Sequence, residues 1–275
     1  MMRGILYVVA LPIGNLKDIT LRALETLKEV DLILTEDTRS FLKLQRAYEL
    51  PAKRLESFYK DVERRKEEKI IELLKEGKRV ALCSEAGTPL LSDPGCSLVK
   101  RALEEGVTVV PIPGASAITC ALSVSGFNLS QGFVFLGFPP RNKGEFQKKL
   151  AKIPLDLPLV LFLSPHRFHQ ETKILLECLG NREVLLAREL TKFHEEIRRS
   201  TLEELSQLEN IKGEITLVIG QAEERRDSLL NFEVDLRREY ELLREKGLRK
   251  REIAKQIAQK KGLSVKEVYE LIKDY

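Results

Sequence analysis

Short apolar segments alternate with amphipathic segments through the first half of this chain, and this alternation constrains its fold more than any other feature. The expected strands are Leu6–Ala10, Leu32–Thr35, Arg79–Cys83 and Thr108–Ile112. Between them, apolar residues recur at helical spacing, as in Thr20–Glu29 and Glu63–Lys75. Strands and helices in alternation predict an α/β fold whose strands run parallel.

The helix that precedes the fourth strand carries its own start signal. Asp93 is a favoured N-cap residue, and Pro94 suits the first helical position. We therefore expect this helix to begin at Asp93 and to end near Gly106.

The second half of the chain is predicted to form another α/β domain. Its expected strands are Phe133–Gly137, Leu159–Leu163, Glu183–Ala187 and Glu214–Ile219. Its expected helices are Lys143–Lys152, Gln170–Leu179 and Leu202–Leu208, the last preceded by a capping box between Thr201 and Glu204. We expect an N-terminal α/β domain at 1–115, a C-terminal α/β domain with a mixed sheet at 116–222, and a basic helical tail at 223–275.

The tail is dominated by charged helical segments. Arg249–Lys260 and Ser264–Lys273 are predicted helices with a turn at Lys261-Gly262, and Ser264 with Glu267 forms a capping box. Between residues 241 and 261 there are eight basic residues and three acidic ones. This spacing suits a helix-turn-helix, and a solvated helical hairpin that packs on the body is the alternative.

Composition excludes several classes of protein. The 275 residues are 43% hydrophobic and 32% charged, with a net charge of +4, which is typical of a globular chain. No apolar run is long enough to cross a bilayer, and no secretory leader is recognised. Cys83, Cys96, Cys120 and Cys178 are too far apart for a zinc knuckle or a redox pair. We expect no bound metal, no membrane contact and a cytoplasmic location.

The glycines exclude the common nucleotide-binding motifs. No two of the 16 glycines are separated by a single residue, so the GxGxxG fingerprint of dinucleotide-binding folds is absent. The glycine–lysine signature of a P-loop is also missing. Any nucleotide-like ligand must therefore bind through a different arrangement of loops.

Four of the expected strands are each followed by a loop of small, rigid, hydroxyl-bearing or acidic residues. These loops are Leu11–Asn15, Glu36–Arg39, Ser84–Pro89 and Pro111–Ser116. Because the carboxyl ends of parallel strands lie at one edge of a sheet, the loops are expected to converge on a ligand. Ordinary strand-to-helix turns favour the same residue types, and they remain the alternative for any single loop.

These loops and several later segments resemble one family in order along the chain. The matching segments are Leu6–Leu16, Glu36–Arg39, Ser84–Pro89, Ser92–Gly95, Pro113–Ala117, Ser164–Arg167 and Arg188–Lys192. From about residue 5 to 220, the chain resembles the ribosomal RNA small-subunit methyltransferase I family of the tetrapyrrole methylase superfamily. It departs from that family at Leu11, Glu85, Ala115 and Leu163, where the family usually has Thr, Asp, Pro and Glu.

The resemblance implies a two-domain class III (tetrapyrrole methylase-like) methyltransferase with a C-terminal helical extension, in which S-adenosylmethionine (S-adenosyl-L-methionine) folds into the cleft between the domains. It also implies methyl transfer to the ribose 2′-oxygen of a decoding-region cytidine in 16S rRNA of the small ribosomal subunit, by a homodimer. Methylation of a uroporphyrin- or corrin-type tetrapyrrole is the alternative. A DNA-binding regulator with a ligand-sensing body is a third hypothesis.

The same resemblance assigns expected roles to individual residues. Cofactor contacts are expected at Pro12, Glu85, Ala86, Gly87, Thr88, Ser116, Ala117, Leu163, Ala187 and Thr216. A ribose hydroxyl is a weak acid that benefits from a proton acceptor, and the acid–base candidates are Glu36, Asp37, Glu189 and Lys192. RNA contacts are expected at Arg39, Arg141, His166 and Arg167.

Overall fold

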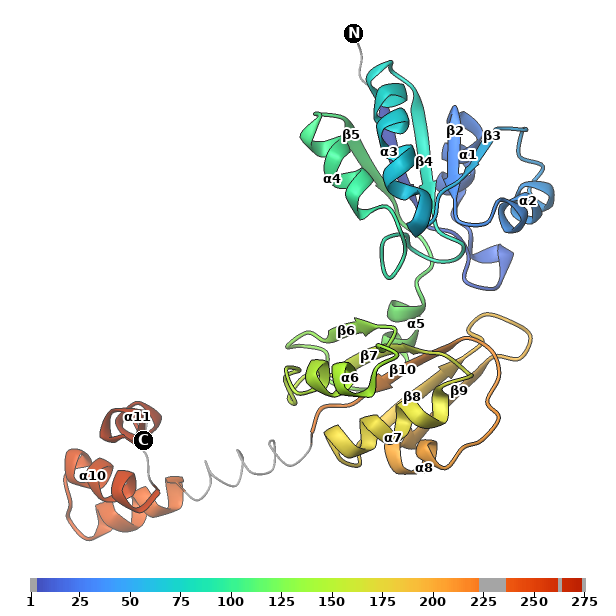
Figure 1. Cartoon of the computed structure of the whole chain (residues 1–275). Coiled ribbons are helices and arrows are strands. Elements are labelled where there is room, and N and C mark those ends of the chain that lie inside the picture. The colour runs from blue at the N-terminus through green and yellow to red at the C-terminus, as the bar shows by residue number, and fades with distance from the viewer. Residues whose placement is uncertain (1–3, 223–235, 262–263, 274–275) are drawn as a thin grey trace. The chain divides into compact units, whose positions relative to one another are not determined.

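The structure is a computed structural model that describes residues 4–222, 236–261 and 264–273. The chain divides into two compact units, Met1–Gln221 and Ala222–Tyr275. The first unit contains two five-stranded sheets with helices packed on them, and the described part of the second unit is helical (Figure 1). This architecture confirms the predicted α/β class. Of the helices described, none is both long and apolar enough to span a membrane.

The first sheet is entirely parallel, with the strand order β3–β2–β4–β1–β5. Its strands are β1 (Ile5–Val9), β2 (Leu32–Thr35), β3 (Arg54–Ser57), β4 (Arg79–Cys83) and β5 (Thr108–Ile112). Its helices are α1 (Leu21–Glu29), α2 (Thr38–Ala47), α3 (Lys60–Lys75) and α4 (Cys96–Glu104). Successive strand residues face opposite sides, so Leu32 and Leu34 pack with α3 and α4 whereas Ile33 packs with α1 and α2. Both faces of the sheet are therefore buried, as a parallel sheet requires.

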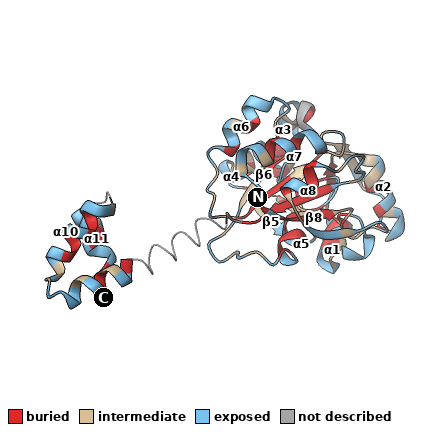
Figure 2. Ribbon diagram, turned by 90° about the horizontal axis from the view of Figure 1, so that it is seen from below, coloured by how far each residue is buried: buried red, intermediate tan, exposed pale blue. Residues whose placement is uncertain are grey.

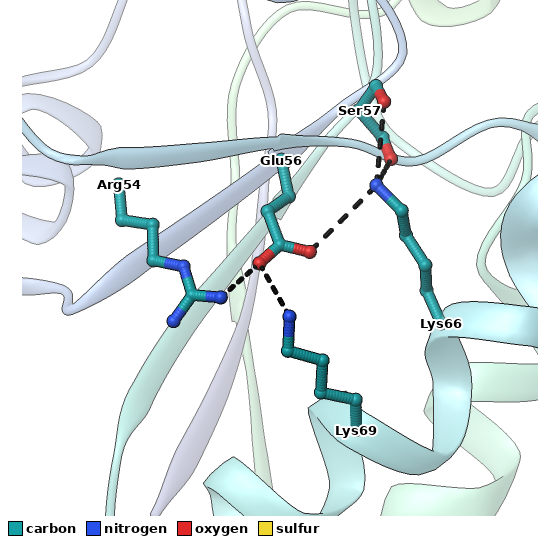
Figure 3. Close-up of polar contacts among 5 residues, drawn as sticks. All are labelled: Arg54, Glu56, Ser57, Lys66 and Lys69. Carbon is teal, nitrogen blue, oxygen red and sulfur yellow. Dashed lines mark hydrogen bonds and ion pairs between the residues drawn. The ribbon is translucent and has the colours of Figure 1, made fainter.

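Edge strand β3 was not predicted from the sequence, and side-chain charges hold it against α3 (Figure 3). The carboxylate of Glu56 pairs with Lys66 at 3.8 Å, with Lys69 at 3.5 Å, and with Arg54 of its own strand. Lys66 also donates to the backbone carbonyl of Ser57 at 2.6 Å. β3 has one apolar residue, Leu55, among three charged or polar ones, and its ion pairs need α3 as a partner, so its sequence shows no strand pattern of its own.

The second sheet is mixed, with the strand order β6–β7–β10–β8–β9. Its strands are β6 (Val134–Gly137), β7 (Leu159–Leu163), β8 (Glu183–Arg188), β9 (Glu196–Thr201) and β10 (Ile215–Ile219). Only the β6–β7 pair is parallel among these strands. Helices α6 (Lys143–Leu150), α7 (Phe168–Leu179) and α8 (Leu202–Ser206) cover one face, and the short α5 (Ala117–Ser123) packs on the other. Strand β10 is buried at every position and β7 at every position but one. Figure 2 shows the buried residues, in red, gathered in the strands and on the inner faces of the helices of the first unit.

The helix start predicted at Asp93 is wrong. Helix α4 begins at Cys96, and its N-cap is Gly95 with φ +119°. The backbone N–H of Gly95 donates to Glu63 of α3 at 2.9 Å, and the Ser97 hydroxyl donates to the same carboxylate oxygen at 2.8 Å. A carboxylate from a neighbouring helix thus takes the capping role expected of Asp93, because it satisfies a free N–H at the positive end of the helix dipole.

The second unit has an apolar core of its own. Residues 236–245, α10 (Lys250–Lys261) and α11 (Val265–Leu271) are helical, which confirms the two helices predicted in the tail. Tyr240, Ile257 and Val268 are buried together within this unit. Part of the predicted turn at Lys261-Gly262, and the Glu267 side chain of the predicted capping box, lie outside the described residues.

A substitution that leaves a cavity in this small core is expected to unfold the second unit without unfolding the first. Ile257 is fully buried, and truncation of a buried isoleucine costs about 2–5 kcal/mol, which a unit of this size has little stability to offset. In the Ile257→Ala variant, we expect amide hydrogen exchange to lose protection in residues 236–273 and to keep it in the sheets. Gln256→Ala, at an exposed neighbouring position, is the control and should leave all protection unchanged. Loss of protection across both sheets in the Ile257 variant would contradict the expectation.

Candidate functional site

A cavity of about 960 Å³ lies in the first unit, where the loops of the first sheet meet the α5 face of the second sheet. Its volume is at the upper end of the range of about 300–1,000 Å³ that ligand pockets occupy. All four loops that follow β1, β2, β4 and β5 contribute lining residues, including Pro12, Glu36, Gly87 and Ser116. The second sheet contributes residues such as Thr216. The cavity therefore forms at the sheet edge where parallel α/β folds bind ligands.

Hydrogen bonds tie these loops to one another. Leu11 and Gly87 exchange two backbone hydrogen bonds, of 2.9 and 3.0 Å. The Thr88 hydroxyl donates to the backbone carbonyl of Ala115 at 3.1 Å. A Cβ atom at Gly114 would lie only 2.9 Å from the Ala10 side chain, so glycine is needed for this close approach. The backbone lining of the cavity is thus fixed by contacts between loops that are distant in sequence.

A contact with the second sheet extends this network. The backbone N–H of Asn15, after β1, donates to the Thr191 hydroxyl at 2.9 Å. A Cβ atom at Gly14 would lie 2.5 Å from the Lys192 side chain. The loop after β1 therefore packs directly on the turn between β8 and β9.

One wall of the cavity is acidic. Glu36, Glu85 and Asp93 all line it. Burial and the charge of Glu85 raise the pKa of Glu36, and burial together with the charge of Glu36 raises the pKa of Asp93 to about 6. Within the described residues, no group of His, Cys, Asp and Glu side chains has the arrangement of a metal site. The raised pKa values therefore reflect carboxylates that repel one another in a partly desolvated site.

The turn between β8 and β9 brings a fixed positive charge, that of Lys192, to the cavity lining. Lys192 Nζ lies 2.9 Å from Glu189 Oε1 and 3.1 Å from Glu214 Oε2. Partial burial would lower the pKa of Lys192, but its hydrogen bonds to these two carboxylates raise the pKa above the usual value. The hydrogen bond from the Glu214 backbone N–H, and that from Lys192, lower the pKa of Glu189. Lys192 is therefore a permanent cation, and Glu189 is a weak proton acceptor.

The turn that carries these residues is strained. Glu189 and Thr191 have φ angles of +50° and +66°, which non-glycine residues rarely adopt. A Cβ atom at Gly213 would lie 2.5 Å from the Glu189 side chain, so the neighbouring chain leaves space for that carboxylate. Backbone strain of this kind concentrates at functional sites, because the surrounding structure must enforce it.

Most of the residues expected to contact a cofactor lie at this cavity. Those that line it are Pro12, Glu85, Ala86, Gly87, Thr88, Ser116, Ala117, Leu163 and Thr216. Ala187 does not line the cavity and is buried in the core beneath it. The structure thus brings together nine of the ten residues from segments spread across both sheets.

The acid–base candidates occupy different environments. Glu36, Glu189 and Lys192 line the cavity, whereas Asp37 does not. Asp37 accepts a hydrogen bond from the backbone N–H of Arg39 as the N-cap of α2, and it pairs with the Arg39 guanidinium at 3.0 Å. That pairing lowers the pKa of Asp37. Asp37 therefore fixes the start of α2 next to Glu36.

The four residues expected to contact RNA lie outside the cavity lining. Arg39 is largely exposed and paired with Asp37, and Arg141 and His166 are exposed. Arg167 donates to backbone carbonyl groups and pairs with a buried carboxylate. None of these four side chains lines the cavity.

Asp93 and Phe138 are among the lining residues to which the sequence assigned no role at the site. Asp93 lies in one of the family-like segments, but its interpretation as an N-cap concealed a role at the site. Phe138 follows β6 and carries no pattern that distinguishes it from the other phenylalanines. Only the packing of the loops identifies both residues as part of the site.

Comparisons with known proteins agree on one family. The sequence model of the family described as Tetrapyrrole (Corrin/Porphyrin) Methylases matches residues 5–206. The protein named Ribosomal RNA small subunit methyltransferase I from Halalkalibacterium halodurans is 40% identical over 98% of this chain and 94% of its own length. The protein of that name from Thermotoga maritima is 45% identical over 80% of this chain and 100% of its own length.

Solved structures share the fold at lower sequence identity. Diphthine synthase has a TM-score of 0.61 at 19% identity and covers 79% of this chain and 90% of its own. The methyltransferase CobJ has a TM-score of 0.59 at 22% identity and covers 80% of this chain and 95% of its own. These similarities confirm the predicted two-sheet class III methyltransferase architecture.

The acidic wall is expected to lower the stability of the folded protein near neutral pH. The folded-state pKa of Asp93 lies above its unfolded value, so its contribution to stability is present at low pH and is lost as the pH rises through about 6. At pH 8, Asp93→Asn should therefore raise the free energy of unfolding by about 1 kcal/mol after allowance for solvent screening, and the melting temperature by about 2–4 °C.

Differential scanning calorimetry at several pH values checks this expectation. The difference between the Asp93→Asn variant and the wild type should shrink toward pH 4, where the aspartate is protonated in the folded protein. Asp156→Asn, at an exposed position, is the matched control and should change the melting temperature little at any pH. A variant at Asp93 that is less stable than the wild type at pH 8 would contradict the electrostatic account.

Proposed function

Because the chain belongs to the Tetrapyrrole (Corrin/Porphyrin) Methylases family, and within it to the ribosomal RNA small subunit methyltransferase I members, we propose that it is an rRNA methyltransferase that uses S-adenosylmethionine. We propose as its target the ribose 2′-oxygen of a decoding-region cytidine in 16S rRNA of the small ribosomal subunit. The proposal includes action in the cytoplasm as a homodimer. The observation that carries it is 38–45% identity to relatives of that name over most of the chain.

The lining of the cavity supports the proposed cofactor. It combines apolar lining from Pro12 and Leu163 with backbone groups of tightly linked loops, which can bind a nucleoside and an amino acid at once. Gly87, at φ +73°, lets backbone groups come close to a ligand. When bound, S-adenosylmethionine supplies a methyl group attached to a positively charged sulfur. The nine cavity-lining residues expected to contact it would hold it mainly through backbone and van der Waals contacts.

Glu36 is the proton acceptor in this proposal. The ribose hydroxyl must lose its proton as its oxygen forms a bond to the methyl carbon, and the proton passes to a carboxylate. Glu36 lines the cavity and has a raised pKa, which makes it a better acceptor than the hydrogen-bonded Glu189. In this proposal, the main catalytic contribution is the positioning of the ribose oxygen against the methyl group.

Lys192 is proposed to bind a phosphate beside the target ribose. Its ammonium stays protonated, lines the cavity, and is held in position by two carboxylates. Lysine acts on phosphate as a point charge, so this contact would position the RNA without reading its sequence.

Methyl transfer to isolated small subunits tests the proposal. With S-adenosylmethionine and subunits that lack the modification, mass spectrometry should find one added methyl on the ribose of a decoding-region cytidine. Glu36→Gln should lower kcat by about 10²–10⁴-fold because the amide cannot accept the proton. Glu104→Gln, at an exposed position on α4, should have no effect. Methyl transfer to a uroporphyrin-type acceptor but not to RNA would refute the proposed substrate.

The second unit is proposed to add affinity for RNA. It lies beyond the region matched by the family model, which ends at residue 206. Exposed basic side chains of α10, such as Arg251 and Lys255, can neutralise phosphates, and such binding weakens as salt concentration rises. The first unit by itself contains every residue of the cavity.

Removal of residues 222–275 should therefore weaken RNA binding by about tenfold or more, while the Kd for S-adenosylmethionine stays within about twofold of the wild type. The double variant Arg251→Glu/Lys255→Glu tests the same surface in the full-length chain and should flatten the salt dependence of RNA binding. Calorimetry measures both affinities. Equal loss of cofactor and RNA affinity on truncation would show that the second unit is structural only.

A further inference from the structure

Phe138 is an exposed aromatic residue on the wall of the cavity. Its side chain lines the cavity, yet the residue is 56% exposed, which places it at the mouth. Single exposed apolar residues are common on protein surfaces and need no special explanation. Phe138 differs from such residues because contacts fix the backbone on both sides of it.

On its N-terminal side, Phe138 follows an irregularity at the end of β6. The pairing register with β7 shifts between Phe135 and Gly137, and Gly137 has φ +71°. A Cβ atom at Gly137 would lie 2.8 Å from the Ser92 hydroxyl, so this turn packs against the loop that carries Asp93. A strand irregularity of this kind redirects the following side chain.

On its C-terminal side, Phe138 precedes two prolines that Arg167 holds in place. Each proline fixes its own φ angle. Arg167 donates to the backbone carbonyl of Pro139 at 3.3 and 3.4 Å and to that of Pro140 at 3.5 Å. Arg167 is in turn paired at 3.0 Å with the buried carboxylate of Glu171. Arg167 is thus a positioning residue for this turn.

Other aromatic rings support Phe138. Its ring centroid lies 5.4 Å from that of Phe162, at an angle of 52°. Phe162 packs edge-on against Phe135 at 5.1 Å and 71°. Phe162 and Phe138 both line the cavity, whereas Phe135 does not line it and packs, partly buried, against the core of the second sheet. One ring at the mouth is therefore backed by others and free to contact a flat ligand.

The carboxylates that line the cavity with Phe138 indicate which kind of flat ligand binds there. Asp93, next to the Ser92–Gly137 contact, and Glu36 and Glu85 in the same cavity offer carboxylate oxygens. Carboxylates accept hydrogen bonds from the exocyclic amino group of cytosine, and they repel phosphate. An aromatic ring binds an unpaired nucleobase by stacking, and this interaction is sequence-tolerant by itself. The combination favours an amino-bearing base, rather than a phosphate, against Phe138.

We propose that Phe138, backed by Phe162, is a stacking platform for the amino-bearing base of the target nucleotide, taken out of its RNA helix, and that Asp93 accepts a hydrogen bond from that amino group. This assignment rests on the proposed function. The adenine ring of the cofactor is also flat and carries an amino group, so it is the competing ligand for Phe138. The exposure of Phe138 at the mouth favours the RNA base.

Four full-length variants distinguish the RNA base from the adenine ring of the cofactor as the ligand of Phe138. Phe138→Ala and Phe138→Leu should raise the KM for small subunits about 10- to 100-fold. Phe138→Tyr should keep a KM near that of the wild type because it retains the ring. The Kd for S-adenosylmethionine, measured by calorimetry, should change less than about twofold in all three. Phe133→Ala removes another exposed phenylalanine, 43% exposed and outside the cavity, and should leave both values unchanged.

A binding measurement tests the platform without methyl transfer. A single-stranded oligonucleotide with one fluorescent cytosine analogue should be quenched by the wild type and by Phe138→Tyr, and not by Phe138→Ala. Unlabelled oligocytidine should compete better than oligouridine, and Asp93→Ala should abolish that preference.

The possible outcomes are distinct. Weaker cofactor binding in Phe138→Ala with an unchanged KM for subunits would assign the ring to adenine and overturn the inference. Absence of quenching by the wild type would also overturn it, whether or not RNA is methylated. Quenching that depends on Phe138 in a protein that transfers no methyl group to RNA would support the platform and refute the proposed reaction.

Discussion

The parallel pairing of β1 with β4 and β5 is the constraint on which the rest of the site depends. Because these strands run in the same direction, their carboxyl ends and the loops that follow lie at one edge of the sheet. The hydrogen bonds between Leu11 and Gly87, and the close approach of Gly114 to Ala10, then fix the loops against each other. Helix α5 follows the last of these loops directly, so the same pairing also anchors the second sheet beneath the cavity.

Acidic residues from the first sheet's loops and a lysine from the turn between β8 and β9 line the same cavity. Burial and the charges of neighbouring carboxylates raise the pKa values of Glu36 and Asp93, the latter to about 6. Two carboxylates hold Lys192 in its charged form. Titratable groups whose pKa values are pushed apart in this way mark the division of roles in many active sites. In the proposed reaction, Glu36 receives the proton of the ribose and Lys192 binds a phosphate.

Physical reasons separate the parts of the fold that could be predicted from those that could not. Strands such as Leu32–Thr35 and Arg79–Cys83 were predicted with their observed bounds because both faces are buried and every residue is constrained. Strands β3 and β9 were missed because they are polar edge strands that form only beside a partner. Helix α2 was also missed, although Phe41 and Leu44 lie on its buried face, because the polar cluster at its start was interpreted as a loop.

The sequence by itself determined the alternation of elements, the apolar faces that build both sheets, and the small or acidic residues at the strand ends, because these properties are local along the chain. Tertiary structure decided which side chains those ends present to the cavity. Asp93 lines the cavity, and Glu63 of another helix takes the capping role at the start of α4. Phe138 lines the cavity beside a turn that Arg167 binds. Arg167 pairs with Glu171, and Asp37 pairs with Arg39, so both side chains stabilise local structure. The neighbours of a side chain decide what chemistry it can do, and these neighbours are set by folding rather than by sequence spacing.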